Sequence, residues 1–471
     1  MRKITELEGR LRRVSYDTSP AVRTSLQRLN DITPHLNLSY VIRATFPPEY
    51  SLENIVMPEP FYFVNATRSI LGDFAPETIR TFLMWKVIDR LAPWVGADVT
   101  NRLVDYEAKI TDGAAKRKTS DAESCLEALE TGPSWVRGAF ASVLTWATNR
   151  FFLERSYPPE MRSITDAYIR RLKTTIIANI RSKSWLSEQA KSASDKHISA
   201  VRPLIGFPDY LLDPLLLANR SAPLKLTSSH VQNALALARA DAHFTWYPLP
   251  PAMQGTGFLP ESFLSSSAWY APSANTVEVD AGMAQPPYFT PGAPEYANWG
   301  IYGTSLGHEL THVVESRAMP EWDDASKKAL DARARCFDAQ YSSMTVKARN
   351  GTLLPLQGSK ERIENTGDQG GVRASFAAWK ASRAEQNRAK GKGEGEEEPR
   401  LPGMEAFTNE QMFFLAWAQA WCEVGTPEYM EKTVSSSHPP SFARAQGSLA
   451  NSREFRVAFN CPSKEPTCEV W

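Results

Sequence analysis

The sequence predicts a mainly α (α+β) protein of two lobes, and three observations support this prediction. The chain has 471 residues and 42% hydrophobic content, enough to bury substantial cores, and this length favours two lobes over one. Apolar residues recur at three- and four-residue spacing through much of residues 16–235, which is the period of packed helices. A short alternating run with β-branched residues comes later, so we expect a small sheet in the second half.

Three segments of the first half carry the clearest helical period. They are IRTFLMWKVIDRLAPWV (79–95), GAFASVLTWATNRFFLE (138–154) and DAYIRRLKTTIIANIRSKSWL (166–186). Their stripes predict packed helices in a lobe core, although aromatic stripes could also line a ligand groove. The proline- and glycine-rich run at 246–262 opposes a continued helix, which puts a boundary near 235–255. We therefore expect a helical lobe over 1–240 and a second lobe over 241–471.

Two further segments organise the second lobe. NTVEVDAG (275–282) has the alternation of a short strand and lies one proline-rich loop before the motif described below. RAEQNRAKGKGEGEEEPRLPG (383–403) is rich in Lys, Glu and Gly and too poor in apolar residues to order itself. We predict a solvated insertion between core helices, although its charges could bind a partner.

The charge balance argues against two classes of partner. Lys plus Arg and Asp plus Glu both number 53, so the formal net charge is zero. Such a chain lacks the overall charge that draws proteins to nucleic acid or anionic membranes. No apolar run approaches the roughly 20 residues that span a bilayer, and the charged opening lacks the apolar segment of a signal peptide. We expect no nucleic acid partner and no membrane span in this chain.

The stretch GTSLGHELTHVVE (303–315) carries the strongest chemical signal. On a helix, His308 and His312 project from one face one turn apart and can direct two imidazole nitrogens at one ion. Glu309 would lie beside the attacking water, ready to take its proton. A chance match on an exposed helix is the alternative. A hydrolytic zinc site also needs a third protein ligand and an open position, so the rest of the chain must supply a carboxylate or histidine.

The segment IENTGDQGG supplies that carboxylate. Glu364 and Asp368 are four residues apart, so Glu364 can bind the ion while Asp368 accepts the free ring N–H of a histidine ligand. Most such pairs are merely solvated helix faces, and only the coupling to the first motif favours a metal site.

Several stretches in order resemble one enzyme family. GHELTH, ENTGD, FFLAWAQAWC (413–422), HPPSFAR (438–444), NSREFRVAFNC (451–461) and the final CEVW together resemble the neprilysin family, which includes endothelin-converting enzyme. The match is close from about residue 230 to Trp471 and looser upstream, including at 185–211. The resemblance implies a zinc metalloendopeptidase that acts on peptide substrates and binds one Zn²⁺. It also implies a helical lobe and a thermolysin-like zincin catalytic lobe with a small sheet.

The resemblance assigns roles to individual residues. It implies His308, His312 and Glu364 as zinc ligands, Glu309 as general base and Asp368 as the residue that orients His308. His438 is the implied oxyanion donor, and Arg444 is implied to grip substrate carbonyl groups with its planar fork of donors.

The resemblance also implies a substrate strand and a pocket. SAWY (267–270) stands where the family has an Asn-Ala-aromatic-Tyr stretch that pairs with extended peptide. We therefore expect main-chain contact near Ala268 and a changed side-chain contact at Ser267; a buried edge strand is the alternative. The family's pocket for the substrate residue that follows the scissile bond corresponds here to Met283, Tyr288, Thr304 and Ser305. Unpaired hydroxyls there would alter the family's preference for large apolar side chains.

Other positions depart from the family or remain open. Glu315 keeps one carboxylate after the second histidine, and Ser436 stands where the family often has an aspartate near His438. These changes bear on catalytic rate more than on zinc binding. The resemblance implies a Cys336–Cys468 disulfide, whereas the partners of Cys422 and Cys461 lie in a part of the family that this chain lacks. By this resemblance, we expect either a pared-down helical lobe or an incomplete chain.

Kinship also implies an extracellular or secretory location, which suits four N-x-S/T sequons at Asn37, Asn65, Asn219 and Asn350. Our functional prediction is a zinc endopeptidase restricted to oligopeptides. The rival is a zinc-binding, catalytically weak protein that binds peptides or partners. A structural zinc site fits poorly, because such sites favour four protein ligands rich in cysteine.

Overall fold

We analysed a computed structural model that describes residues 2–14, 21–32, 39, 40, 43, 56–110, 122, 143–222, 224–246, 265–272, 274–393, 396–434 and 436–471. The chain forms two compact units. Unit 1 comprises residues 1–151, 209–254 and 259–262, and unit 2 comprises 152–208, 255–258 and 263–471. Within the described residues, no helix is long and apolar enough to cross a membrane.

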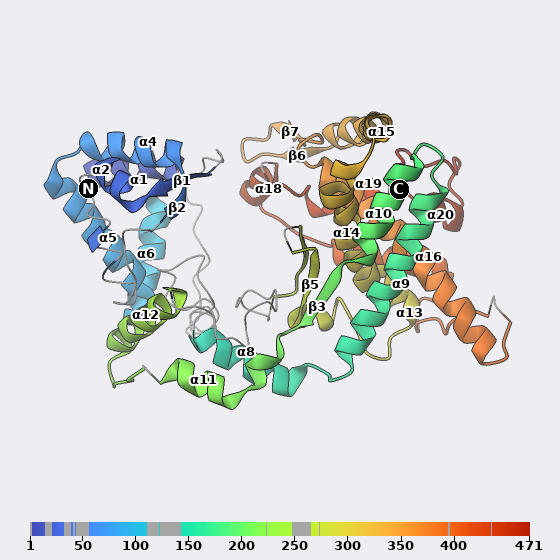
Figure 1. Cartoon of the computed structure of the whole chain (residues 1–471), viewed down its shortest axis with the longest axis horizontal. Helices are drawn as coiled ribbons and strands as arrows, with labels where there is room; N and C mark the ends of the chain where they lie inside the picture. Colours follow the sequence, from blue (N-terminus) through green and yellow to red (C-terminus); the bar gives the residue numbers. More distant parts are fainter. Residues whose placement is uncertain are drawn as a thin grey trace. The chain divides into compact units, whose positions relative to one another are not determined.

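Unit 1 is built mainly from helices, drawn in blue to light green in Figure 1. Its elements are α1 (Arg2–Val14), β1 (Ala21–Ser25), α2 (Leu26–Ile32), β2 (Val56–Pro60), α4 (Phe61–Gly72), α5 (Pro76–Val95), α6 (Ala97–Ile110), η1 (Asp209–Leu212), α11 (Pro214–Ser221) and α12 (His230–Trp246), with the first part of α8 (Val143–Ser156). β1 and β2 pair antiparallel. One core cluster joins Leu7, Ile70, Leu71 and Ile79. It ties together α1, α4 and α5 by burial of their apolar faces.

Two predicted helices lie in this part of the chain. The helix expected over 79–95 is confirmed as α5, which Pro76 begins, and the chain leaves the helix at Gly96, with φ of 144°. The helix expected over 138–154 is confirmed in its described part as α8, and residues 138–142 lie outside the described residues.

Unit 2 holds the candidate chemistry. Its elements are α9 (Met161–Ser182), α10 (Glu188–Ser199), β3 (Arg202–Gly206), β4 (Ala268–Ala271), β5 (Thr276–Asp280), η2 (Ala281–Ala284), α13 (Glu295–Asn298), η3 (Trp299–Gly303), α14 (Thr304–Val313), η4 (Val314–Ala318), η5 (Met319–Glu321), α15 (Asp324–Ser342), β6 (Thr345–Lys347), β7 (Leu353–Pro355), α16 (Arg362–Ala389), α17 (Asn409–Ala420), α18 (Pro427–Thr433), α19 (Ser441–Ala450) and α20 (Arg453–Ala458). The centre of unit 2 is formed where α9, α14 and α16 pack together (Figure 1).

The helix expected over 166–186 is confirmed over 166–182, within α9, but it belongs with unit 2 rather than with the first lobe. Ile169, Leu172, Ile176 and Ile180 form its buried stripe, and α9 packs on both α14 and α16. Residues 152–208 therefore group with the second unit, unlike the division at 240/241 expected from the sequence. The helical period of a segment does not say which core its apolar face joins.

A three-stranded sheet lies beside these helices, in the order β3-β5-β4. β5 is parallel to β3 and antiparallel to β4, and all five of its residues are buried. The strand predicted at 275–282 is confirmed as β5. β4, which holds the AWY of SAWY, is an edge strand.

The prediction of a solvated loop over 383–403 is partly wrong. α16 continues to Ala389, so the first residues of that segment are helical. Further on, Glu398 is only 6% exposed and accepts hydrogen bonds from Trp379 Nε1 at 2.8 Å and from the backbone N–H of Glu295 at 2.5 Å. Composition underestimates order here because partners elsewhere in the chain stabilise the buried carboxylate.

The helix that carries the histidine motif is flanked by two π-helical segments, η3 before it and η4 after it. The carbonyl oxygen of Trp299 in η3 accepts from Ser375 Oγ of α16 at 2.6 Å and from Thr304 Oγ1 at 3.3 Å. The backbone N–H of Thr304 also bonds to this oxygen, so the two hydroxyls add to a backbone hydrogen bond of the π-helical segment.

Candidate metal centre

The site is formed where α14 crosses α16 at close range. A Cβ built on Gly307 would lie 3.0 Å from Gly371 Cα, and one on Gly371 would lie 2.6 Å from the Thr304 carbonyl oxygen. Glycine is therefore required where the two backbones meet. This crossing sets Glu364 and Asp368 of α16 opposite His308 and His312 of α14.

Three potential ligand atoms converge between these helices. His308 Nε2 lies 3.1 Å from Glu364 Oε2 and 3.0 Å from His312 Nε2, and His312 Nε2 lies 3.7 Å from the same Glu364 oxygen. Behind them, His308 Nδ1 lies 2.8 Å from Asp368 Oδ1. The structure brings together all four residues that the sequence singled out.

This arrangement fits a zinc ion. Two imidazole nitrogens face each other beside a carboxylate oxygen, and a single N–H on one ring cannot serve both neighbours at once. A cation between the three atoms removes that conflict, and two histidines with one glutamate form a known donor set for zinc sites that keep an open position. The second ring nitrogen of His312 is buried without a partner in the described part of the chain.

The surroundings favour the metal-binding forms of Glu364 and His312, but the protonated form of His308. Burial alone would raise the pKa of Glu364, but hydrogen bonds with His308 and His438 hold it far below its usual range. Burial and the charge of His308 lower the pKa of His312 to about 3. Burial alone would lower the pKa of His308, yet hydrogen bonds with Asp368 and Glu364 raise it to about 10. Metal binding must therefore displace a proton from His308.

Glu309 lies beside the ligand atoms and contacts the edge strand. Its Oε2 accepts the backbone N–H of Tyr270 in β4 at 2.8 Å, and one of its oxygens lies within 4.8 Å of ligand atoms of His308 and His312. Burial and the charge of Glu364 raise the pKa of Glu309 to about 7, against the opposing charge of His308. Such a pKa suits a general base near neutral pH.

Asp368 is fully buried and held by Arg444 of α19. Arg444 Nε donates to Asp368 Oδ2 at 2.8 Å, and Nη2 donates to Oδ1 at 2.5 Å. Burial alone would raise the pKa of Asp368, but Arg444 and His308 keep it low. The guanidinium carbon also lies 3.9 Å from the ring centroid of Trp421. Sequence reasoning missed this tryptophan, although it lies in the quoted FFLAWAQAWC.

His438 approaches the ligand atoms from the loop after α18. Its Nε2 lies 2.9 Å from Glu364 Oε2, and half of the side chain is exposed. The ring Nδ1 lies 3.2 Å from Ser437 Oγ, whereas Ser436 Oγ accepts the backbone N–H of His438 at 3.3 Å. The hydroxyl that contacts the ring is thus Ser437.

β4 presents main-chain groups beside Glu309. The Ser267 carbonyl oxygen accepts from Asp280 N at 3.0 Å, so Ser267, Trp269 and Ala271 direct their main-chain groups at β5. Ala268 and Tyr270 alternate with them and direct theirs away from β5, which agrees with the bond from Tyr270 to Glu309. One side of β4 therefore offers main-chain groups near the site.

The hydroxyls expected to face a substrate pocket are engaged inside the helix. Thr304 Oγ1 donates to the Trp299 carbonyl and Ser305 Oγ donates to the Ile301 carbonyl at 2.9 Å. Met283 is buried and Tyr288 is half-buried. These two hydroxyls therefore make the expected substrate pocket less polar than the sequence alone predicts.

Glu315 packs against α16 instead of supporting His312. Its Oε1 accepts from Thr366 Oγ1 at 2.6 Å, while Oε2 has no partner in the described residues. The predicted disulfide between Cys336 and Cys468 is present, with Cα atoms 5.6 Å apart, and Cys422 and Cys461 form no disulfide among the described residues.

Two family models match the chain. Both are described as Peptidase family M13, one over residues 267–469 and the other over residues 1–208. Endothelin-converting enzyme 1 of Homo sapiens is 29% identical over 70% of this chain and 43% of its own length. The Mus musculus enzyme is 24% identical over 95% of this chain and 57% of its own length. Neprilysin-3 of Drosophila melanogaster is 28% identical over 70% and 42%. The chain spans about half the length of these relatives.

Solved structures show the same fold. The inhibitor complex of Mycobacterium tuberculosis zinc metalloprotease Zmp1 superposes with a TM-score of 0.72 and 20% identity, over 99% of this chain and 68% of that one. PepO of Lactobacillus rhamnosis superposes with a TM-score of 0.69 and 15% identity, over 98% and 67%. These likenesses confirm the expected fold class.

Proposed function

Because this chain belongs to peptidase family M13, we propose that it is a zinc-dependent endopeptidase that hydrolyses peptide bonds of oligopeptides. One observation carries the proposal: His308 Nε2, His312 Nε2 and Glu364 Oε2 converge, with Glu309 beside them. In this proposal the two histidines and Glu364 hold the ion, and Asp368 orients His308 through its Nδ1.

Zinc, when bound, supplies Lewis-acid chemistry that polarises a carbonyl and makes water a better nucleophile. Glu309 accepts the proton of the attacking water and passes it to the leaving amine. The backbone N–H of Tyr270 donates to Glu309 Oε2 at 2.8 Å, so Glu309 keeps this hydrogen bond while its other oxygen faces the peptide. That bond orients Glu309 towards the ligand atoms.

Peptide binding is proposed along β4. The outward main-chain groups of Ala268 can pair with an extended substrate, as in strand addition at a sheet edge. The Ser267 main chain is bound to Asp280, so Ser267 contributes at most through its hydroxyl. The restriction to oligopeptides comes from the family resemblance.

His438 and Arg444 are proposed to act on the carbonyl groups of the substrate. His438 is half-exposed with Nε2 directed at Glu364, so a small movement of its ring presents an N–H to a developing oxyanion. Arg444 uses Nε and Nη2 on Asp368, and Nη1, which makes no hydrogen bond within the described part of the chain, is proposed to face the substrate. Its primary task here is to hold Asp368.

The alternative is a catalytically weak protein that binds zinc and peptides. It is favoured by Ser436 and Ser437, because among the described residues the hydroxyl of Ser437 lies against Nδ1 of His438, where the family resemblance implies a nearby carboxylate. It predicts zinc binding and peptide binding without turnover.

An extracellular or secretory location is also proposed. The Cys336–Cys468 disulfide suits an oxidising compartment. The sequon at Asn350 lies exposed between β6 and β7, where Asn350 Oδ1 accepts the Thr352 N–H at 2.9 Å. Asn219 is exposed as well, whereas Asn37 lies outside the described residues.

Metal removal and return test the proposal. We expect the purified chain to contain one zinc per molecule, to lose cleavage of a short peptide after chelation, and to regain it with zinc. Cleavage of the peptide at the same rate without metal would contradict zinc dependence. Comparing the peptide with a folded protein tests the size restriction, which equal rates would contradict.

A further inference from the structure

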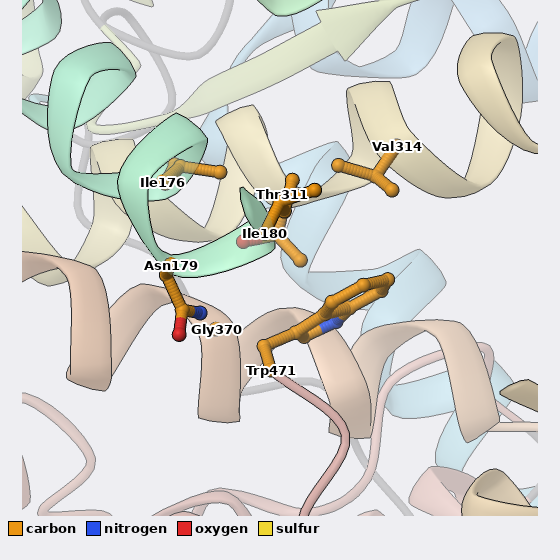
Figure 2. A pocket seen from close by; sticks show the side chains of 7 residues that line it. All are labelled: Ile176, Asn179, Ile180, Thr311, Val314, Gly370 and Trp471. Carbon is orange, nitrogen blue, oxygen red and sulfur yellow. The ribbon is translucent and has the colours of Figure 1, made fainter. Parts of the chain in front are cut away.

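Trp471 lies against the candidate zinc helix, next to Thr311 and Val314. Its side chain is 3% exposed. It lines a small cavity with Thr311 of α14, Val314 of η4, Gly370 of α16 and residues of α9, namely Ile176, Asn179 and Ile180. Figure 2 shows the indole next to α16, facing Thr311 and Val314.

The backbone of Trp471 is fixed to α16. Gln369 Oε1 accepts the N–H groups of Val470 at 3.0 Å and of Trp471 at 3.2 Å. Arg373 Nη1 donates to the Trp471 carbonyl oxygen at 2.7 Å. The disulfide from Cys468 to Cys336 ties the same segment to α15. The backbone that carries the indole is therefore fixed by α16 and α15 rather than by α14.

The indole meets α14 at the residue before a proposed zinc ligand. A Cβ on Gly370 would lie 2.5 Å from Thr311 Oγ1 and 3.0 Å from Trp471 Cδ1, so these three residues share one contact point. Thr311 precedes His312 in the chain, and Gly370 follows Asp368 by two residues. Packing at this point therefore affects the positions of both α14 and α16, the two helices that supply the proposed zinc ligands.

Packing rather than hydrogen bonding holds the ring. Trp471 Nε1 is buried and has no partner in the described part of the chain. A phenylalanine ring can therefore supply much of the same contact, whereas a smaller side chain leaves a gap behind α14. This difference separates a role of the ring from a role of its N–H.

We infer that Trp471 is a positioning residue that sets the separation of α14 and α16 and thereby the affinity of the site for zinc. The inference rests on the proposed function, because it assumes that His308 and His312 share the ion with Glu364 of the other helix. Ligand atoms supplied by two helices bind one ion well only if the helices keep a fixed distance.

The test compares matched variants by zinc affinity and by spectroscopy, not by activity. We would measure the zinc dissociation constant by competition with a chelator, and the visible absorption of the Co²⁺-substituted protein, for wild type, Trp471→Leu, Trp471→Phe and Trp379→Leu. Trp379 is a buried tryptophan of α16, and its Nε1 donates to Glu398 Oε1. All measurements are made where circular dichroism shows a folded protein.

We expect Trp471→Leu to weaken zinc binding by about tenfold or more and to change the Co²⁺ spectrum, as loss of support around a metal site does. Trp471→Phe should restore most of the affinity, and Trp379→Leu should lower stability alone. A folded Trp471→Leu protein with wild-type zinc affinity and Co²⁺ spectrum would overturn the inference. If that variant does not fold, Gly370→Ala decides: unchanged zinc affinity overturns the inference. A wild type that binds no zinc overturns the proposed function as well.

Discussion

Arg444 holds Asp368 with two guanidinium nitrogens, at 2.8 Å from Nε to Oδ2 and 2.5 Å from Nη2 to Oδ1. Asp368 is fully buried and also meets His308 Nδ1 at 2.8 Å. A buried charge pair of this kind is costly to break from one side. The orientation of His308 therefore depends on a residue from α19.

Arg444→Met should destabilise the zinc-free protein by up to about 3–5 kcal/mol, because the buried Asp368 charge loses Arg444 and keeps His308 as its remaining cationic partner. The double variant with Asp368→Asn should lose less than the sum of the two single changes. Urea unfolding of all four proteins measures the coupling. Arg453→Met, which removes an exposed pair with Glu465, is the control and should leave the midpoint unchanged. Additive losses would show that the pair is not coupled.

Gly371→Ala should separate the two helices of the site. The new Cβ would lie 2.6 Å from the Thr304 carbonyl and 2.8 Å from His308 N, and both are backbone atoms. Overpacking of this kind costs about 1–3 kcal/mol and should weaken zinc binding as well. Gly393→Ala, whose Cβ meets nothing within 4 Å, is the matched control. Zinc titration and thermal unfolding check both; equal zinc affinity in the two variants would refute the role of the crossing.

Removing the disulfide should destabilise the protein strongly. Cys336 and Cys468 are 132 residues apart, and closing so long a loop is worth about 5 kcal/mol in the chain-entropy model, an upper figure. The paired Ser variant should therefore unfold at lower urea concentration than wild type. Cys422→Ser with Cys461→Ser, which removes two free thiols, should not. The same midpoint in both double variants would contradict this expectation.

The stability of the zinc-free protein should fall as pH rises, in part because of Glu315. Burial raises its pKa from 4.5 to about 7. The folded state thus holds the proton more tightly, and the stability this provides is present below pH 4.5 and lost as pH rises through 7. The loss amounts to roughly 3 kcal/mol. Glu315→Gln should remove that part of the slope between pH 4.5 and 7.5 in urea unfolding. An identical slope in wild type and variant would mean that Glu315 titrates normally.

Much of the site could be predicted because its signals are local. His308 with His312, and Glu364 with Asp368, are each four apart on one helix, and helix geometry alone places each pair on one face. What the sequence could not show is how the two helices meet. That depends on Gly307 and Gly371, which are far apart in the chain. In the sequence each looks like a residue that weakens a helix, and only the structure shows that they let the two backbones approach closely.

The remaining differences have the same physical origin. The π-helical segment η3 is contacted by Ser375 of another helix, and the local sequence does not predict either the segment or this contact. Glu398 lies in a stretch whose composition predicts solvent, yet Trp379 and Asn409 bury it. Trp421 was overlooked because stacking on Arg444 depends on how α17 meets α19.

The proposed role of Glu309 gives the most direct test of the central claim. Zinc content and peptide hydrolysis should be measured together for wild type and Glu309→Gln, which keeps the size of the side chain and removes the base. We predict that both proteins bind one zinc ion, that the wild type hydrolyses peptide, and that the variant is slower by about 10²–10⁴-fold. Zinc in both proteins with equal hydrolysis would contradict the proposed mechanism, and zinc in neither would contradict the site itself.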